Sequence, residues 1–198
     1  KSAYILKEKI KQFLGILIFS IGVCLTAILF TYDPTDPSFR SATSTSANNI
    51  LGTFGSYIAD PLHLAIGMSA YGLSLLCFTW SWRLILKKSS QNFVQRISFT
   101  PVSIALLSML LAAHPIPNNW SFSYGSGGVF GDNALSLILG ITLFEINNWL
   151  KITTVALAIS TTAVLSYTLG ITIDETKKFC RLLVQIILDS LKLLFLRK

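Results

Sequence analysis

The amino-acid sequence predicts an all-α integral membrane protein with four transmembrane helices, an outer-face re-entrant or interfacial helix and a C-terminal amphipathic helix. Two observations support this fold class. Hydrophobic residues make up 52% of the 198 residues and charged residues only 13%, whereas an ordinary soluble domain carries about 25% charged residues. In addition, charged residues are missing from four long apolar stretches, at residues 13–31, 64–82, 97–113 and 152–173.

Each of these stretches has a length that suits a transmembrane helix, because about 20 residues are needed to cross a hydrocarbon core of about 30 Å. A single Arg, Lys or Asp at the centre of such a helix costs roughly 2.5–3.5 kcal/mol. Their repeated absence therefore indicates a lipid environment. No small-residue cleavage site follows the first stretch, so we expect a retained anchor and not a signal peptide.

The basic residues gather on one side of the predicted membrane. Four precede the first span, four lie between the second and third spans, and six follow the fourth, which leaves only Arg40 and Lys151 elsewhere. This positive-inside pattern predicts that both termini are cytoplasmic. The net charge of +7 is then a consequence of topology, and we expect membrane lipids with anionic head groups as its partner, not nucleic acid.

A fifth apolar stretch, residues 134–146, tests the number of spans. Its 13 residues are few for a spanning helix and typical of an interfacial or re-entrant one. With four spans the 16 basic residues divide 14 inside to 2 outside, whereas a fifth span would divide them 9 to 7. We therefore predict a helix at residues 132–146 on the outer face.

The first predicted outer loop begins with two Asp-Pro pairs, Asp33-Pro34 and Asp36-Pro37. A residue before proline is pushed out of the α region, so two such pairs in series predict a stiff exit from the membrane. The loop then leads into the second span, with Asp60 and its following proline as a predicted helix start. The polar and small residues on this approach are Asn49, Gly52, Gly55 and Asp60.

The second outer loop carries a glycine cluster, Gly127, Gly128 and Gly131, which predicts a turn. A phosphate-binding loop would need a lysine and a serine or threonine after its last glycine, and Asp132 follows instead. We expect no catalytic, cofactor-binding or metal-binding residues in this domain. His63 and His114 lie near the outer ends of spans, where histidines are more often interfacial residues than metal ligands.

The competing function classes are a small membrane transporter or channel subunit and a membrane-bound enzyme. A transporter needs ionisable residues along a pathway inside its spans, and the predicted spans hold no charged residue. An enzyme needs a cluster of reactive side chains at one interface. The only candidates are outer residues that can equally begin helices and turns, namely Asp33, Asp36, Asp60, His63, His114 and Asp132.

The fourth span carries one regular pattern of small side chains, at Thr154, Ala158, Thr162, Ser166 and Gly170. Such a ridge lets helix backbones approach closely in lipid, so we predict a helix contact within the chain or between subunits. Residues 1–173 form the predicted transmembrane domain. Residues 174–198 form a helix with a wide apolar face and a cationic strip, which predicts either a helix at the cytoplasmic interface or packing on a further domain.

Three motifs occur in order along the chain: Tyr-Asp-Pro-Thr-Asp-Pro-Ser at residues 32–38, Asn-x-x-Gly-x-x-Gly-x-Tyr-x-Ala-Asp at residues 49–60, and Gly-Gly-Val-Phe-Gly at residues 127–131. Together they resemble the N-terminal four-helix membrane domain of the FtsK-type (FtsK/SpoIIIE) septal DNA translocases. The resemblance covers residues 10–173. It implies a membrane anchor and septal-targeting domain in the bacterial inner membrane, within the machinery that couples cell division to chromosome segregation.

The same resemblance implies that this domain is not itself the enzyme. In that family a linker leads to a hexameric cytoplasmic motor, so ATP, magnesium and DNA binding are expected only there. Division-site proteins are the implied partners, together with homo-oligomerisation through the motor. Because the chain begins with Lys1 and carries no motor motif, we expect that it is a piece of a longer protein.

Overall fold

The computed structural model describes residues 2–86, 92–116, 120, 122–141, 146–178, 181, 182 and 185. Within that part every element is helical, which confirms the all-α prediction. The elements are α1 (Ser2–Phe30), α2 (Gly52–Ile66), the 3-10 helix η1 (Gly67–Ala70), α3 (Tyr71–Ile85), α4 (Phe93–Ser98), α5 (Thr100–Ala112), α6 (Gly128–Gly140) and α7 (Ile146–Thr168).

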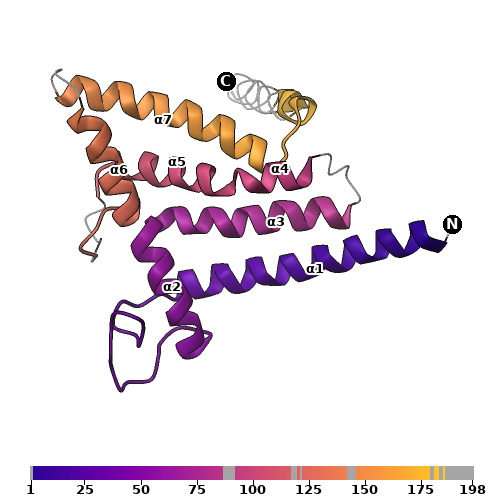
Figure 1. The fold of residues 1–198 in the computed structure, drawn as a ribbon, viewed down its shortest axis with the longest axis horizontal. Helices are drawn as coiled ribbons and strands as arrows, with labels where there is room; N and C mark the ends of the chain where they lie inside the picture. The colour runs from indigo at the N-terminus through magenta and orange to yellow at the C-terminus, as the bar shows by residue number, and fades with distance from the viewer. Residues whose placement is uncertain are drawn as a thin grey trace, which may run out of the picture.

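Four helical segments of the described chain are long and apolar enough to cross a membrane, which confirms the predicted number. They run over Ile5–Phe30, Gly52–Ile85, Phe93–Ala112 and Asn148–Thr168. Figure 1 shows α1, α3, α5 and α7 lying side by side, with α1 beginning and α7 ending at the same end of the bundle. Four antiparallel helices place the start of the first and the end of the last at the same end of the bundle, as observed here.

Two helices run across the other end of the bundle, which we call the α2–α6 end. Figure 1 shows α2 and α6 at a steep angle to the four long helices, and α2, α5 and α6 pack on one another there. Helix α6 is the predicted outer-face helix, although it begins at Gly128 rather than 132. Helix α6 ends at Gly140, residues 142–145 of the predicted helix lie outside the described residues, and Ile146 belongs to α7.

The glycine cluster predicted as a turn is a turn at its first two members. Gly127 lies in the turn before α6, and Gly128 closes it with φ 70° and a bond from its N–H to the Gly125 carbonyl at 2.9 Å. The prediction was wrong for Gly131, which lies in the first turns of the helix and is buried against the Ser108 backbone, because glycines are also required where two backbones touch. Sequence alone does not separate that use from a turn.

The second span is bent. The prediction placed one helix at residues 64–82 with its start at Asp60, but α2 already begins at Gly52 and carries Pro61 in its interior. The bend is η1, where Gly67 adopts φ 58° and ψ −139°, a conformation open almost only to glycine. This break allows α2 to turn across the end of the bundle while α3 continues along it.

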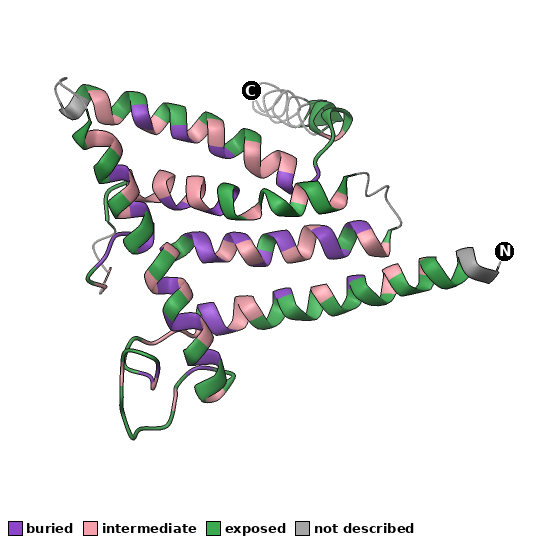
Figure 2. Ribbon diagram, viewed as in Figure 1, coloured by how far each residue is buried: buried purple, intermediate pink, exposed green. Residues whose placement is uncertain are grey.

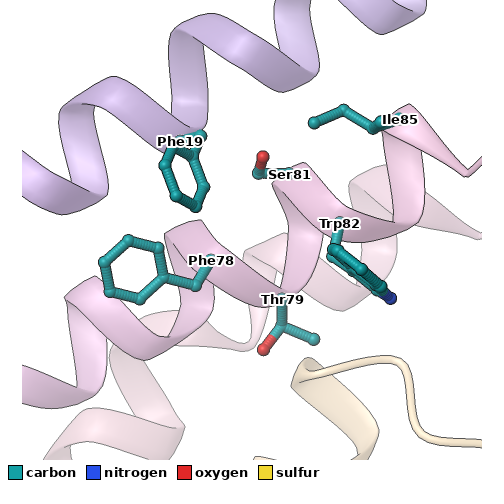
Figure 3. Close-up of a pocket in the computed structure, with 6 residues that line it drawn as sticks. All are labelled: Phe19, Phe78, Thr79, Ser81, Trp82 and Ile85. Atoms are coloured by element: carbon teal, nitrogen blue, oxygen red, sulfur yellow. The ribbon is translucent and has the colours of Figure 1, made fainter.

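Helices α1 and α3 approach closely through glycines of α1. A Cβ on Gly15 would lie 2.9 Å from Ile85 Cγ1, and one on Gly22 would lie 3.0 Å from Cys77 Cβ. Larger residues at both positions would push the helices apart. Beside this contact lies an open groove of about 500 Å³, which Figure 3 shows with its lining residues Phe19, Phe78, Thr79, Ser81, Trp82 and Ile85. Its walls are mostly carbon, so it offers shape and no reactive group.

The packed face of α7 is not the predicted ridge. Thr153, Leu157 and Thr161 are buried, whereas Thr162 is exposed, and the other ridge members on α7 (Thr154, Ala158, Ser166) are only half-buried. Gly170 lies after the end of the helix, at φ 72°. The packed face is therefore centred one residue before the predicted ridge, about 100° around the helix, and the half-buried ridge members lie at its edge. A ridge contact between subunits stays a prediction.

We expect Leu157→Ala to lower the free energy of unfolding by about 2 kcal/mol, the low end of the range for Leu→Ala, because in detergent mainly the lost packing counts. Ile159 is 67% exposed on the same helix, so Ile159→Ala is the matched control and should cost well under half as much. Thermal unfolding in detergent measures both. Equal melting temperatures would mean that the buried side of α7 carries no packing energy.

The end of α7 is held by side chains from α3 and α4. Its last carbonyls accept from three donors: Arg96 Nη1 to Tyr167 (3.2 Å), Trp80 Nε1 to Thr168 (3.1 Å) and Arg83 Nε to Leu169 (3.0 Å). Residues 173–178 then form a further helical turn. Most of the predicted amphipathic helix at 174–198 lies outside the described residues.

Candidate functional site

A buried polar network at the α2–α6 end centres on Asp60 of α2. Its carboxylate is only 2% exposed and pairs with the guanidinium of Arg40 from the loop after α1. Arg40 Nε lies 3.0 Å from Oδ2, and Nη2 pairs with Oδ1. Tyr32 donates its hydroxyl to Oδ1 at 2.8 Å. A buried carboxylate is tolerated only when partners of this kind replace its water.

One turn further along α2, His63 contacts both loops at this end, the one after α1 and the one before α6. Its ring stacks on Tyr32 (4.6 Å between centroids) and contacts Phe122 (4.6 Å) and Trp120 (5.8 Å). His63 Nδ1 shares a hydrogen bond of 2.8 Å with the Tyr124 hydroxyl. Burial raises the pKa of both Tyr32 and Tyr124, so both hydroxyls keep their protons and remain donors.

His63 and His114 do not meet. His114 is exposed and its Nδ1 lies 2.8 Å from the Leu110 carbonyl oxygen of its own helix. Within the described part of the chain, no three His, Cys, Asp or Glu residues gather closely enough to hold a metal ion.

A second buried corner ties the first loop to the end of α1. The Asp36 carboxylate accepts the backbone N–H groups of Asn48 (2.7 Å) and Asn49 (3.0 Å). The Asn49 side chain in turn donates to the carbonyls of Ile28 (2.8 Å) and Thr31 (3.3 Å). These carbonyls have no partner further along the helix, so Asn49 caps α1. Gly55 is required beside it, because a Cβ there would overlap the Asn49 amide.

The Asp-Pro pairs behave differently from each other. Asp33 forms an exposed turn, where its Oδ1 accepts Thr35 Oγ1 (2.6 Å) and N (2.9 Å); the Thr35 hydroxyl is the main cause that lowers the Asp33 pKa. Pro34 is exposed beside it. The second pair turns inward, with Asp36 buried and the Pro37 carbonyl accepting the Ser56 hydroxyl at 2.6 Å.

Glycine backbones join α2, α5 and α6. Met68 N donates to Ser126 O at 2.9 Å, and a Cβ on Gly67 would lie 2.5 Å from Gly128 N. Gly127 and Gly131 both lie against the Ser108 carbonyl of α5, with no room for a side chain. Gly52 is different, since it has φ 62° and open space around it. These contacts lock the two loops onto the bundle.

The arrangement is a scaffold, because its buried polar groups already have partners within the chain. What it displays is the loop surface, defined here as residues 33–47, in which residues 42–46 are exposed. The prediction missed Tyr32, Arg40, Phe122 and Tyr124 as members of the network. Arg40 did carry a signal, since it is one of only two basic residues away from the cytoplasmic clusters.

Comparison with known proteins agrees with this architecture. The family model described as the 4TM region of DNA translocase FtsK/SpoIIIE matches residues 7–177. The chain belongs to the FtsK/SpoIIIE family. No solved structure matches the chain significantly.

Curated FtsK relatives match over most of the chain. The DNA translocase FtsK of Caulobacter vibrioides is 30% identical over 165 residues, which are 81% of this chain and 20% of that protein. The FtsK of Azospirillum brasilense is 31% identical over 123 residues (61% of this chain, 20% of that protein), and that of Rickettsia bellii 34% over 115 residues (58% and 15%). The chain therefore spans about a fifth of the length of these relatives.

In this FtsK membrane region the three motifs lie at one end of the bundle. The first and second motifs meet where Asp36 holds Asn49 and where Tyr32 holds Asp60. The third motif meets the α2–η1 bend at Gly67. In this chain the motif residues thus hold the loops together, and residues 42–46 between the first two motifs are exposed.

Proposed function

We propose that this chain is the membrane anchor and the septal-targeting and assembly domain of a bacterial DNA translocase that couples cell division to chromosome segregation. The observation that carries the proposal is the loop surface, which is tied at Asp36 and Arg40 to a four-span membrane domain of the FtsK family. A domain that only anchored a protein would need no such network, since one span suffices for insertion. The exposed residues 42–46 of this anchored loop are the part that a partner protein can recognise.

The proposed site of action is the bacterial inner membrane at the division septum. Both termini are cytoplasmic and the α2–α6 end faces outward, which is supported by the 14-to-2 charge split and by α1 beginning where α7 ends. Division-site proteins are the proposed partners of the loop surface. ATP, magnesium, DNA and hexamer formation are assigned to a motor elsewhere in the full protein, and the domain alone is proposed to have no ATPase activity.

Reporter fusions test the topology. Fusions after Lys88 and after Lys198 should report a cytoplasmic location, and fusions after Ser44 and after Ile116 an external one, because the positive-inside rule places the basic links in the cytoplasm. Alkaline phosphatase and fluorescent-protein fusions give opposite readouts at each position. An external location after Lys198 would contradict the topology and mean that 134–146 spans the membrane.

Localisation of residues 1–198 alone tests the targeting function. The fluorescently tagged domain is expected at the division site, whereas an unrelated four-span protein with the same tag should spread over the membrane. Arg40→Met should weaken septal enrichment without preventing insertion, because it releases the loop surface from Asp60. A uniform distribution of the tagged domain, alongside a septal full-length protein, would place the targeting signal outside this domain.

A further inference from the structure

The faces of α2 are reversed relative to those of a helix in a soluble protein. The side turned into the protein is small or polar: Gly55, Ser56, Ala59, Asp60 and His63 are buried. The side turned away carries apolar and aromatic residues, which we call the α2 apolar face. Its exposed members are Phe54, Tyr57, Pro61 and Ala65, and the remaining exposed residue of α2 is Thr53 in the first turn.

This face carries no charge. Between residues 50 and 70 the only ionisable side chains besides Tyr57 are Asp60 and His63, and both point inward, 2% and 6% exposed. Phe54, by contrast, is 69% exposed. An exposed apolar stripe of this kind on an otherwise well-satisfied helix marks contact with another apolar phase.

The depth of α2 identifies that phase. Gly55 packs on Ile28, and Ile50 N donates to Thr31 Oγ1 at 3.1 Å, so the start of α2 lies level with the last turn of the first span. Phe30 in that turn is 81% exposed and Ile50 is 65% exposed. Figure 2 shows exposed residues along α1 and at the start of α2. The α2 apolar face is therefore continuous with the lipid-facing surface of α1.

An aromatic pair marks the edge of this surface. Phe39 of the loop surface lies edge-on against Tyr57, with 4.9 Å between ring centroids, and Phe39 is itself 77% exposed. Aromatic residues of this kind gather at the level of the lipid head groups. Their position indicates that the boundary between lipid and water passes beside α2.

We propose that α2 lies in the plane of the membrane, with the α2 apolar face and Phe39 buried among the outer-leaflet lipids at the boundary between head groups and acyl chains. An ordinary interfacial helix turns its polar face to water. Here the two loops at the α2–α6 end cover that face, through Tyr32 and Arg40 on Asp60 and Tyr124 on His63. The inference rests on the proposed function only for the topology, which makes the leaflet beside α2 the outer one. The polar part of the loop surface stays outside the lipid, where partner proteins can reach it.

Cysteine labelling in lipid alone tests this. Phe54→Cys and Ala65→Cys are each placed in a Cys180→Ser background, purified and reconstituted into vesicles of phosphatidylethanolamine and phosphatidylglycerol. Ser44→Cys, on the exposed part of the loop surface, is the matched control with the same orientation in the vesicle. Cys24 and Cys77 lie within spans, and the background protein measures their contribution.

A membrane-impermeant maleimide should label Phe54→Cys and Ala65→Cys about tenfold or more slowly than Ser44→Cys, because lipid covers an interfacial apolar face to a depth of about 5–10 Å. All three should label fully after denaturation in SDS. Rates equal to that of Ser44→Cys would overturn the proposal. So would fast labelling in vesicles combined with slow labelling in cells, since a protein partner would then be the cover. None of these rates depends on septal targeting.

Discussion

Replacing Arg40 with methionine is expected to destabilise the protein by about 3 kcal/mol, the low end of the range for a buried charge left without its partner, because the guanidinium is itself partly exposed. The Asp60 side chain is 3% exposed, whereas that of Arg40 is 42% exposed. Without Arg40, the carboxylate stays buried with only neutral hydroxyl donors, Tyr32 and Ser38. Without the carboxylate, Arg40 can turn its guanidinium into water. Loss of Arg40 should therefore lower the free energy of unfolding more than loss of the Asp60 charge.

Asp60→Asn is accordingly expected to cost about 1–2 kcal/mol, since the amide still accepts from Tyr32 and fills the same space. In the double variant, the neutral amide at position 60 removes the stranded charge, so Arg40→Met combined with Asp60→Asn should cost less than the sum of the single changes. Lys151→Met, which removes the other basic residue away from the cytoplasmic clusters at an exposed position, is the control and should be neutral. Chemical unfolding in detergent gives all four values, and additive costs would show that Arg40 and Asp60 are not coupled.

Gly67→Ala is expected to have an effect at least as large, about 3 kcal/mol or more, or to prevent folding. Two causes add. An alanine at φ 58° and ψ −139° is strained by about 1–3 kcal/mol, and its Cβ would collide with Ser126 O and lie 2.5 Å from Gly128 N. These are backbone atoms that cannot turn aside, so α6 would have to move away from the α2–η1 bend. The yield of monodisperse protein and its melting temperature in detergent measure the loss.

Two other glycines separate these causes. Gly52 has φ 62° but no neighbour within 4 Å, so Gly52→Ala should show backbone strain alone, about 1–2 kcal/mol. Gly140 lies in α6 in open space, so Gly140→Ala should be neutral or stabilising by about 0.5–1 kcal/mol. If Gly67→Ala melts like Gly140→Ala, the close contact between η1 and the start of α6 is not present in the folded protein.

Local composition was enough to predict four segments that can cross a membrane, and the described chain has four helical segments of that length and hydrophobicity. A span needs about 20 consecutive residues to cross the hydrocarbon core, and a charge within it is costly to desolvate. Both requirements concern neighbouring residues in the sequence, so local composition is enough to detect a span. Residues 13–31 and 97–113 are therefore close to the observed spans, Ile5–Phe30 and Phe93–Ala112. The order of the three motifs also indicated the family, which the match over residues 7–177 shows.

The partners of the loop residues and the packed faces of the helices could not be read from composition and became visible in the folded protein. Arg40 and Asp60 are 20 residues apart and on different elements, and no local pattern connects them. The ridge at Thr154 and Thr162 was equally compatible with a packed and a lipid-facing side, and the structure buries Leu157 instead. Lipid and protein interior are both apolar, so composition separates them poorly. The contact between two particular surfaces is what distinguishes them, and it exists only once the chain has folded.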